Sequence, residues 1–417
     1  MEKSIELLSK EVDEAEIFFS SSSSNTVEVK AGKVDLFKEN SSSGYGIRVI
    51  KEKRTGFYFC NKLTPEALDK AVKVSNVSQR DEHSALPERQ EYEDLQSYDS
   101  RIDDIGTEKA LEFVEALLQP CNQYKVLATS GAISWGRSEV KILNSNGVEG
   151  SDRGTVISGL LSTVAKDKDV SSGFYFDISK SLDLDFYSIG EEASRLAKDS
   201  LNGEKMDTRK VSIILKPMAV SELIENTLIP SFSADNVQRG RSFLAGKTGE
   251  KISSDIIDLE DNATLDKGLE TSKFDSEGVR SQKTSLIRKG VLKGFLYDTY
   301  TANKENKDST GNAARPSYST LPGVGPSNII VKGKGDLSDE GLLVHGLIGA
   351  HTSNPISGDF SVETRNAYLD GKPVKKAIIS GNIFEILNKI VGFGNDYKQF
   401  SSVKAPSMEF EEIQVSG

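Results

Sequence analysis

Alternating hydrophobic and polar residues dominate the first part of the chain. The runs EIFFSSSS, TVEVKAG, KVDLFKEN, YGIRVIKE and TGFYFCN carry apolar residues at every second position, and Gly, Asn and Ser turns separate them. This spacing is typical of strands with one buried face. A short helix is expected over 5–12, and a second helix opens with Thr64 as its cap and Pro65 at its first position. Residues 1–77 therefore predict an antiparallel meander flanked by helices.

A second unit repeats this order after a charged, irregular stretch over 78–106. A helix over 107–118 precedes strands around KVLATSGAISW, EVKILNSNG, TVISGLLSTVAK and GFYFDIS, and a helix over 189–201 follows. The string GFYF occurs in both units, at 56–59 and at 173–176. A four-letter identity does not decide between a duplication and two independent units, so both interpretations stay open.

The pattern changes after Gly203. KVSIILKP is typical of a buried strand and MAVSELIENTL of a helix, after which come many short strands and turns rich in Gly, Asn and Ser; another helix is expected over 383–390. The predicted fold class is α+β with two domains. The N-terminal domain, 1–203, has helix-flanked antiparallel sheets, with sub-units 1–77 and 107–203 and the linker 78–106. The C-terminal domain, 204–417, is mainly antiparallel β.

Composition and charge exclude several classes of partner. With 52 basic and 63 acidic side chains the net charge is −11, and no block of Lys and Arg breaks this balance, so no nucleic-acid partner is expected. The longest apolar run, 341–350, has about half the length of a membrane span, so no membrane partner is expected. The acidic first residues lack the basic head of a secretory signal, and Cys60 and Cys121 fit no zinc spacing. These features predict a cytoplasmic protein with reduced thiols.

Two candidate sites, a phosphate-binding loop and a histidine-based catalytic or zinc site, lack the residue spacing that their chemistry requires. In GRSFLAGKT, Gly240 and Gly246 enclose five residues instead of the four of a phosphate-binding loop, so a surface turn is predicted. The three histidines are His83, His345 and His351, and no G-x-S-x-G elbow accompanies them. His345 lies in an apolar run, which is typical of a core histidine, and no helix holds it and His351 at a zinc-binding spacing. No metal ligand and no catalytic residue is predicted.

Longer strings resemble the TldD/PmbA family. DNVQRGRSFLAGKTGEK, FDSEGVRSQKTSLIRKGVLKGFLYDTYTA, STGNAARPSY, LIGAHTSNPISGDFS and VGFGNDYKQFSSVKAPSM occur in this order and are similar to the family's carboxy-terminal half. GYGIRVI, TGFYF and NKLTPEALDKAV resemble its amino-terminal half. The resemblance implies two related subunits, TldD and TldE (also called PmbA), which form a cytoplasmic metalloprotease complex that cleaves unfolded peptides.

The zinc-binding positions separate the two subunit types. In TldD a helix carries HExxxH, and a distant carboxy-terminal cysteine completes the zinc site. With Asp235 and 238–240 as the register, the HExxxH positions fall on Glu225, Asn226 and Pro230 here, and FSSVKAPSM lacks the cysteine. An amide cannot act as a general base and proline has no ligating side chain. The resemblance thus implies a TldE-type chain without a metal or other cofactor of its own, with zinc in the partner subunit.

The expected function is that of a metal-free subunit beside a TldD-like, HExxxH-bearing partner, with unfolded peptide as the substrate. Polar turns over 238–241, 312–318 and 352–355 are candidates to line the peptide channel, because donors there can pair with an extended backbone. The candidate residues are Arg239, Arg241, Asn312, Arg315, Tyr318 and Asn354. The alternative is an independent homodimeric binding or regulatory protein that acts on a protein partner such as DNA gyrase, with which the family has been associated. A homodimer in isolation is compatible with either function.

Overall fold

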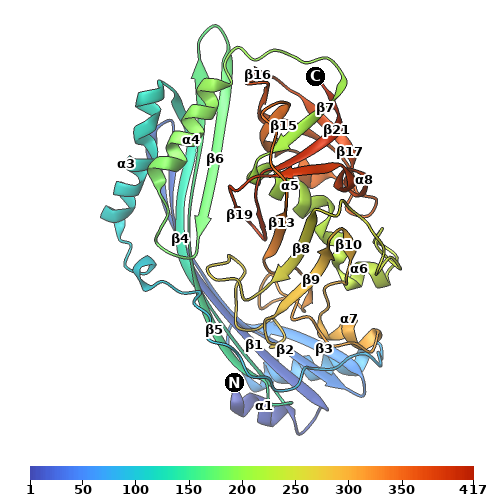
Figure 1. Cartoon of the computed structure of the whole chain (residues 1–417). Coiled ribbons are helices and arrows are strands. Elements are labelled where there is room, and N and C mark those ends of the chain that lie inside the picture. Colours follow the sequence, from blue (N-terminus) through green and yellow to red (C-terminus); the bar gives the residue numbers. More distant parts are fainter.

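A single long sheet forms one side of the molecule and a β-rich body forms the other (Figure 1). The computed structural model describes residues 1–417. The sheet has six strands in the order β3-β2-β1-β4-β5-β6, and all neighbours are antiparallel. Its strands are β1 (Glu14–Lys30), β2 (Lys33–Lys51), β3 (Arg54–Cys60), β4 (Leu127–Asn144), β5 (Glu149–Lys166) and β6 (Val170–Ser179). The two expected sub-units therefore share one sheet.

Strands β1 and β2 are continuous, so the breaks expected inside them are wrong. Each strand joins two of the predicted runs, and Ser22 in the middle of β1 pairs with Ser42 of β2 and with Ser138 of β4. Serine carries no apolar signal, but its backbone extends readily when both neighbouring strands supply hydrogen bonds. The polar middle of these strands is a strand surface that faces no apolar core.

Four helices cover one face of the sheet. They are α1 (Glu2–Leu8), α2 (Pro65–Val77), α3 (Thr107–Tyr124) and α4 (Phe186–Asp199). Thr64 Oγ1 accepts a hydrogen bond from Ala67 N, so the predicted cap of α2 is confirmed. Ile17 of β1 packs in the core with α1 and α2, whereas Val27 packs in the core with α3 and α4. Because successive strand residues alternate faces, the even-numbered residues of β1 face the C-terminal domain.

The repeated string GFYF occupies equivalent places in the two units. It lies in β3 and in β6, the two edge strands of the sheet. A side chain at Gly56 would overlap the backbone of α2 at Ala71, and one at Gly173 would overlap the backbone of α4 at Ala193. Glycine lets a helix approach the edge strand closely at both positions. The shared element order and the shared contact favour the duplication over two independent units.

The C-terminal domain has two larger sheets around one core, which confirms the α+β class. Helix α5 (Pro217–Thr227) contacts strands of both sheets. One sheet has the order β10-β9-β8-β13-β20-β19, and the other has β14-β7-β21-β17-β15-β16 with β18 beside β21. The strands are β7 (Arg209–Leu215), β8 (Ile257–Asn262), β9 (Lys283–Arg288), β10 (Val291–Leu292), β13 (Ile329–Gly333), β14 (Leu342–Ile348), β15 (Asp359–Leu369), β16 (Lys372–Val374), β17 (Ile378–Asn382), β18 (Ile390–Phe393), β19 (Lys398–Phe400), β20 (Val403–Ala405) and β21 (Met408–Ser416). The small elements are α6 (Ala234–Gln238), α7 (Thr299–Lys304), α8 (Ile383–Ile386), β11 (Ala313–Ala314) and β12 (Gly323–Val324).

Two expected segments differ in detail. The helix expected over 383–390 is shorter, because a 3-10 turn follows α8 and the chain then pairs with β21 as strand β18. The irregular stretch 78–106, expected as a linker, packs against the sheet and against the C-terminal domain. Asn144 Nδ2 donates a 2.8 Å hydrogen bond to Pro87 O, and the Tyr92 ring lies 4.9 Å from that of Phe274. No helix combines the length and the apolar composition that a membrane crossing needs.

Candidate functional site

A cavity of about 1090 Å³ lies between the long sheet and the C-terminal domain. One wall consists of the serine run 20–24 of β1 with the facing parts of β4, β5 and β6. The other wall comes from three loops of the C-terminal domain, 269–276, 311–318 and 325–327. This volume is that of a large ligand pocket.

The sheet wall is built from small polar side chains. Ser20, Ser22 and Ser24 share the face of Phe18, and Ser138 of the neighbouring strand β4 also lines the cavity. Small residues keep the cavity open, and each hydroxyl can both donate and accept a hydrogen bond. This wall can therefore pair with peptide N–H and C=O groups without selecting a side chain.

Charged side chains of both signs also line the cavity. The cations on the sheet side are Arg137, Arg153 and Lys180, and the carboxylates are Asp152, Glu270 and Asp275. Lys180 Nζ donates a 2.8 Å hydrogen bond to Thr271 O, and burial lowers the pKa of this amine although Glu270 lies nearby. The lining thus combines neutral hydroxyl groups with charges of both signs.

Three of the six predicted channel residues line the opposite wall, namely Asn312, Arg315 and Tyr318. Asn312 Nδ2 donates to Asp261 Oδ2 at 2.8 Å, which fixes the loop on β8. The Tyr318 ring lies over β2, where a side chain at Gly44 would overlap it. Gly44, the first glycine of the GYG string, therefore leaves the space that the Tyr318 ring of the other domain occupies.

Arg315 belongs to a buried ionic network that joins the domains. Its side chain is fully buried, Nη2 pairs with Glu16, and the guanidinium lies 4.5 Å from the centre of the Phe18 ring. Arg48 bridges Glu16 at 2.5 Å and Glu277 at 2.7 Å. Arg315 Nε and Nη1 have no hydrogen-bond partner. Sequence reasoning missed Glu16, Arg48 and Glu277, although a charge inside the apolar runs EIFF and YGIRVI was a usable signal.

The other three predicted channel residues, Arg239, Arg241 and Asn354, do not line this cavity. Arg239 pairs with Asp235 at 2.8 Å on its own helix, and Asn354 Oδ1 accepts the backbone N–H of Ile356 in a turn. The stretch 238–241 lies beside α7 instead.

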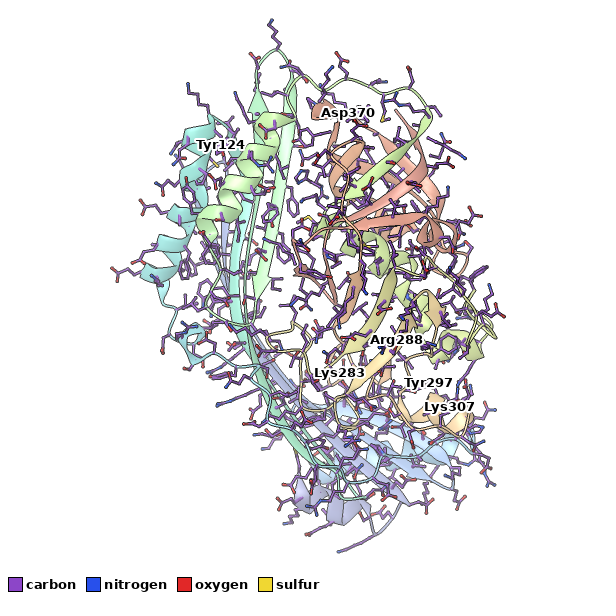
Figure 2. All side chains as sticks on the ribbon, in the orientation of Figure 1. Tyr124, Lys283, Arg288, Tyr297, Lys307 and Asp370 are labelled. Atoms are coloured by element: carbon purple, nitrogen blue, oxygen red, sulfur yellow. The ribbon has the colours of Figure 1, made fainter.

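Gln238 fixes the position of this stretch. Its Nε2 donates to Thr301 O at 2.8 Å and to Glu305 Oε1 at 3.0 Å. Glu305 also accepts hydrogen bonds from Tyr297 and Lys307, which lie close together in Figure 2. The loop that resembles a phosphate-binding motif follows as a series of turns, as predicted.

Helix α5 occupies the place of the expected metal-binding helix. Ser401 Oγ donates to Glu225 Oε1 at 2.6 Å, so the structure brings α5 and the segment FSSVKAPSM together. Asn226 Nδ2 donates to Glu222 O on the same helix, and α5 ends before Pro230. The donors at this place are one carboxylate and serine hydroxyls, whereas a protein zinc site needs three or four ligands from Cys, His, Asp and Glu. No group of three or more His, Cys, Asp or Glu residues in the structure could hold a metal ion.

The two histidines of the C-terminal domain differ in exposure. His345 on β14 is largely buried, as predicted, and burial lowers its pKa to about 4 although Glu192 opposes this shift. His351 is exposed in a 3-10 turn. A neutral imidazole with a pKa this low is a poor base near neutral pH.

Comparisons with known proteins agree along the whole chain. The sequence models of the PmbA/TldA metallopeptidase match in three parts: domain 1 over 15–76, the central domain over 100–201 and the C-terminal domain over 208–417. An uncharacterised protein of Methanocaldococcus jannaschii is 38% identical over 99% of this chain and 98% of its own length. Metalloprotease PmbA of Escherichia coli O157:H7 is 26% identical over 99% and 94%. The crystal structure of TldE from Thermococcus kodakarensis superposes with a TM-score of 0.94 at 29% identity, covering 100% of both chains.

Proposed function

Because the chain belongs to the PmbA/TldD metallopeptidase family, we propose that it is a TldE-type subunit that carries no metal and completes the peptide site of a zinc-bearing, TldD-like partner. One observation carries the proposal. Glu225, the sole carboxylate at the expected ligand positions, already accepts a hydrogen bond from Ser401, where a TldD-type chain would need histidine and cysteine ligands. The chemistry of peptide hydrolysis then belongs to the partner.

The large cavity supports a role in holding peptide. Its serine wall offers donors and acceptors along strand β1, which can pair with the N–H and C=O groups of an extended backbone. Asn312, Arg315 and Tyr318 complete it from the C-terminal domain. The substrate of this proposal is accordingly an unfolded peptide.

A reducing compartment is part of the same proposal. Cys60 and Cys121 are both free thiols, and burial raises the pKa of each. Thiols with raised pKa values are protonated and unreactive near neutral pH. This state suits a cytoplasmic protein.

Metal content and peptide cleavage test the proposal directly. The purified chain, alone and mixed with an HExxxH-bearing partner from the same organism, is assayed for zinc and for cleavage of an unfolded peptide. We expect neither in the chain alone, and both in the mixture. Stoichiometric zinc in the chain alone, with peptide cleavage that Glu225→Ala abolishes, would overturn the proposal. A pull-down that recovers only self-associated chain, or a protein such as DNA gyrase, would favour the homodimeric regulatory alternative.

A further inference from the structure

A second cavity, of about 200 Å³, lies where the central and C-terminal domains meet. It is bounded by β6 and α4 on one side and by β14, β15, the start of α5 and the β18–β19 connection on the other. Figure 1 shows this junction between β6 and the strands β15 and β19. No residue lines both this cavity and the large one. It is therefore separate from the proposed peptide site.

Arg365 is the cation of this cavity that lacks a hydrogen-bond partner. Its guanidinium stacks 4.7 Å from the centre of the Phe174 ring, and the nearest carboxylate oxygen, Glu222 Oε1, is 3.9 Å from Nη1. That distance is too long for a hydrogen bond. The other two cations are already paired: Lys216 with Asp396 at 2.7 Å, and Lys398 with Asp177 at 3.1 Å.

Glu222 does not neutralise Arg365 fully. Its second oxygen, Oε2, accepts a 2.5 Å hydrogen bond from Leu347 N and so faces β14. Burial raises the pKa of this carboxyl group, although Leu347 and Arg365 oppose the shift. The guanidinium therefore keeps several unused donors beside the cavity.

Two neighbours leave the space beside Arg365 open and polar. Gly346 has no side chain, and a Cβ there would lie 3.7 Å from Arg365 Nη1. His345 makes no hydrogen bond within the chain, because Glu192 Oε1 is 3.7 Å from its Nδ1. A neutral imidazole still offers one donor and one acceptor. The polar end of the cavity thus presents a charged donor group and an imidazole without partners.

Five further lining residues carry aliphatic, aromatic or thioether side chains from both domains: Phe174, Leu196, Pro217, Met218 and Phe400. The other lining residues are polar, and the two carboxylates among them already have cationic partners: Glu192 pairs with Arg195 at 2.7 Å, and Asp396 with Lys216 at 2.7 Å. The apolar members can bury a short hydrocarbon body. The volume is below the range of drug-sized pockets, so the ligand must be small.

We propose that this cavity binds a small organic carboxylate with an apolar body, whose carboxylate accepts hydrogen bonds from Arg365. Guanidinium and carboxylate groups form short, charge-assisted hydrogen bonds, which are stronger than neutral ones. The bound molecule contacts β6 and α4 of the central domain together with β14 and β15 of the C-terminal domain. It therefore stabilises the contact between these domains by binding only the folded protein. The proposal does not depend on the peptidase role.

Binding to the full chain tests it, with phenylacetate as the probe and phenylacetamide as its neutral counterpart. We expect saturable one-to-one binding of phenylacetate by calorimetry, a rise in Tm, and at least about tenfold weaker binding of the amide. Inorganic phosphate should bind at least about tenfold more weakly than phenylacetate, because it buries no apolar body. Equal binding of acid and amide, tighter binding of phosphate, or no binding of phenylacetate at about 10 mM would each overturn the proposal.

Variants locate the site. Arg365→Gln should weaken phenylacetate binding at least about tenfold, whereas Arg288→Gln, at an exposed position of β9 (Figure 2), should leave it unchanged. Gly346→Ala keeps every charge but places a methyl group beside Nη1, and it should weaken binding as well. This second variant decides the question if Arg365→Gln does not fold. Unchanged affinity in a folded Arg365→Gln or Gly346→Ala chain would place the ligand elsewhere and refute the assignment.

Discussion

Ser401 Oγ donates a 2.6 Å hydrogen bond to Glu225 Oε1, and this contact joins helix α5 to the turn between β19 and β20. The two residues are 176 positions apart in the chain. The family resemblance puts a zinc ligand of the TldD type at the position of Glu225, and Ser401 belongs to the segment FSSVKAPSM, which lacks the cysteine of that type. Here the contact is an ordinary hydrogen bond, and it makes the carboxylate part of the packing between α5 and its neighbouring strands.

Glu225→Gln should accordingly leave peptidase activity almost intact. The amide oxygen can still accept from Ser401, so we expect a stability loss of about 1 kcal/mol and a change in kcat/KM of the assembled complex of at most about twofold. Zinc content per complex should not change. Activity assays and metal analysis check this, and a loss of zinc together with activity would show that Glu225 is a ligand after all.

Arg48→Met should destabilise the chain strongly. The substitution leaves Glu16 and Glu277 buried, with only Arg315 near Glu16, and breaking a buried ion pair in this way costs about 3 to 5 kcal/mol. Urea denaturation measures the loss. Lys38→Met removes the exposed pair with Glu28 and should cost about 0 to 1 kcal/mol. Similar losses of unfolding free energy in both variants would contradict the expectation that the buried network stabilises the chain more than the exposed pair does.

Ser22→Tyr should obstruct the large cavity. Ser22 lies on the cavity face of β1, so a phenol ring there fills space that the proposed peptide needs. In the assembled complex we expect cleavage of an unfolded peptide to fall at least about tenfold, with most of the effect in KM. Ser43→Tyr, at an exposed position of β2 that does not line the cavity, is the matched control. Equal kinetics in the two variants, with assembly intact, would separate this cavity from peptide binding.

Gly44→Ala should destabilise the chain through a steric overlap with Tyr318. The added methyl group overlaps the Tyr318 ring, and overpacking of this kind costs about 1 to 3 kcal/mol. In the Tyr318→Ala background the same change should cost much less, since the ring is gone. Denaturation of the two single variants and the double variant measures the coupling. Additive losses would mean that the glycine has another purpose, such as backbone freedom.

Lowering the pH should reduce the unfolding free energy through protonation of His345. Burial lowers its pKa to about 4 in the folded chain, against 6.5 ordinarily, so the unfolded chain takes up this proton first. The stability contribution is complete above pH 6.5 and is lost as the pH falls through 4, with a total of about 3 kcal/mol. Glu192 raises this pKa, whereas Arg195 and Lys216 lower it further.

His345→Gln removes this dependence. The difference in unfolding free energy between pH 7 and pH 4.5 should be about 2 to 3 kcal/mol smaller in the variant than in the parent chain, because the carboxylates that titrate there are common to both. His83→Gln, at an exposed position, should leave the difference unchanged. An unaltered pH dependence in His345→Gln would mean that this imidazole is protonated in the fold.

Local patterns determined much of this protein from the sequence alone. Thr64 caps α2 as the cap and proline signals predict, and apolar spacing located α5 and β7. The absence of any histidine between His83 and His345 excluded HExxxH at α5 whatever the register. These signals work because capping, turn chemistry and hydrophobic periodicity depend on residues a few positions apart.

Only the tertiary structure decided which distant residues meet. Strand β1 runs unbroken through its serines because two neighbouring strands supply hydrogen bonds, a condition that no local window contains. Arg315 reaches Glu16 across 299 positions, while Arg239, predicted beside it as a channel residue, lies outside the cavity. Arg365 of the C-terminal domain lines the second cavity and stacks on Phe174 of the central domain. Side-chain contacts of this kind follow from sheet register and domain packing, which sum many weak interactions along the whole chain.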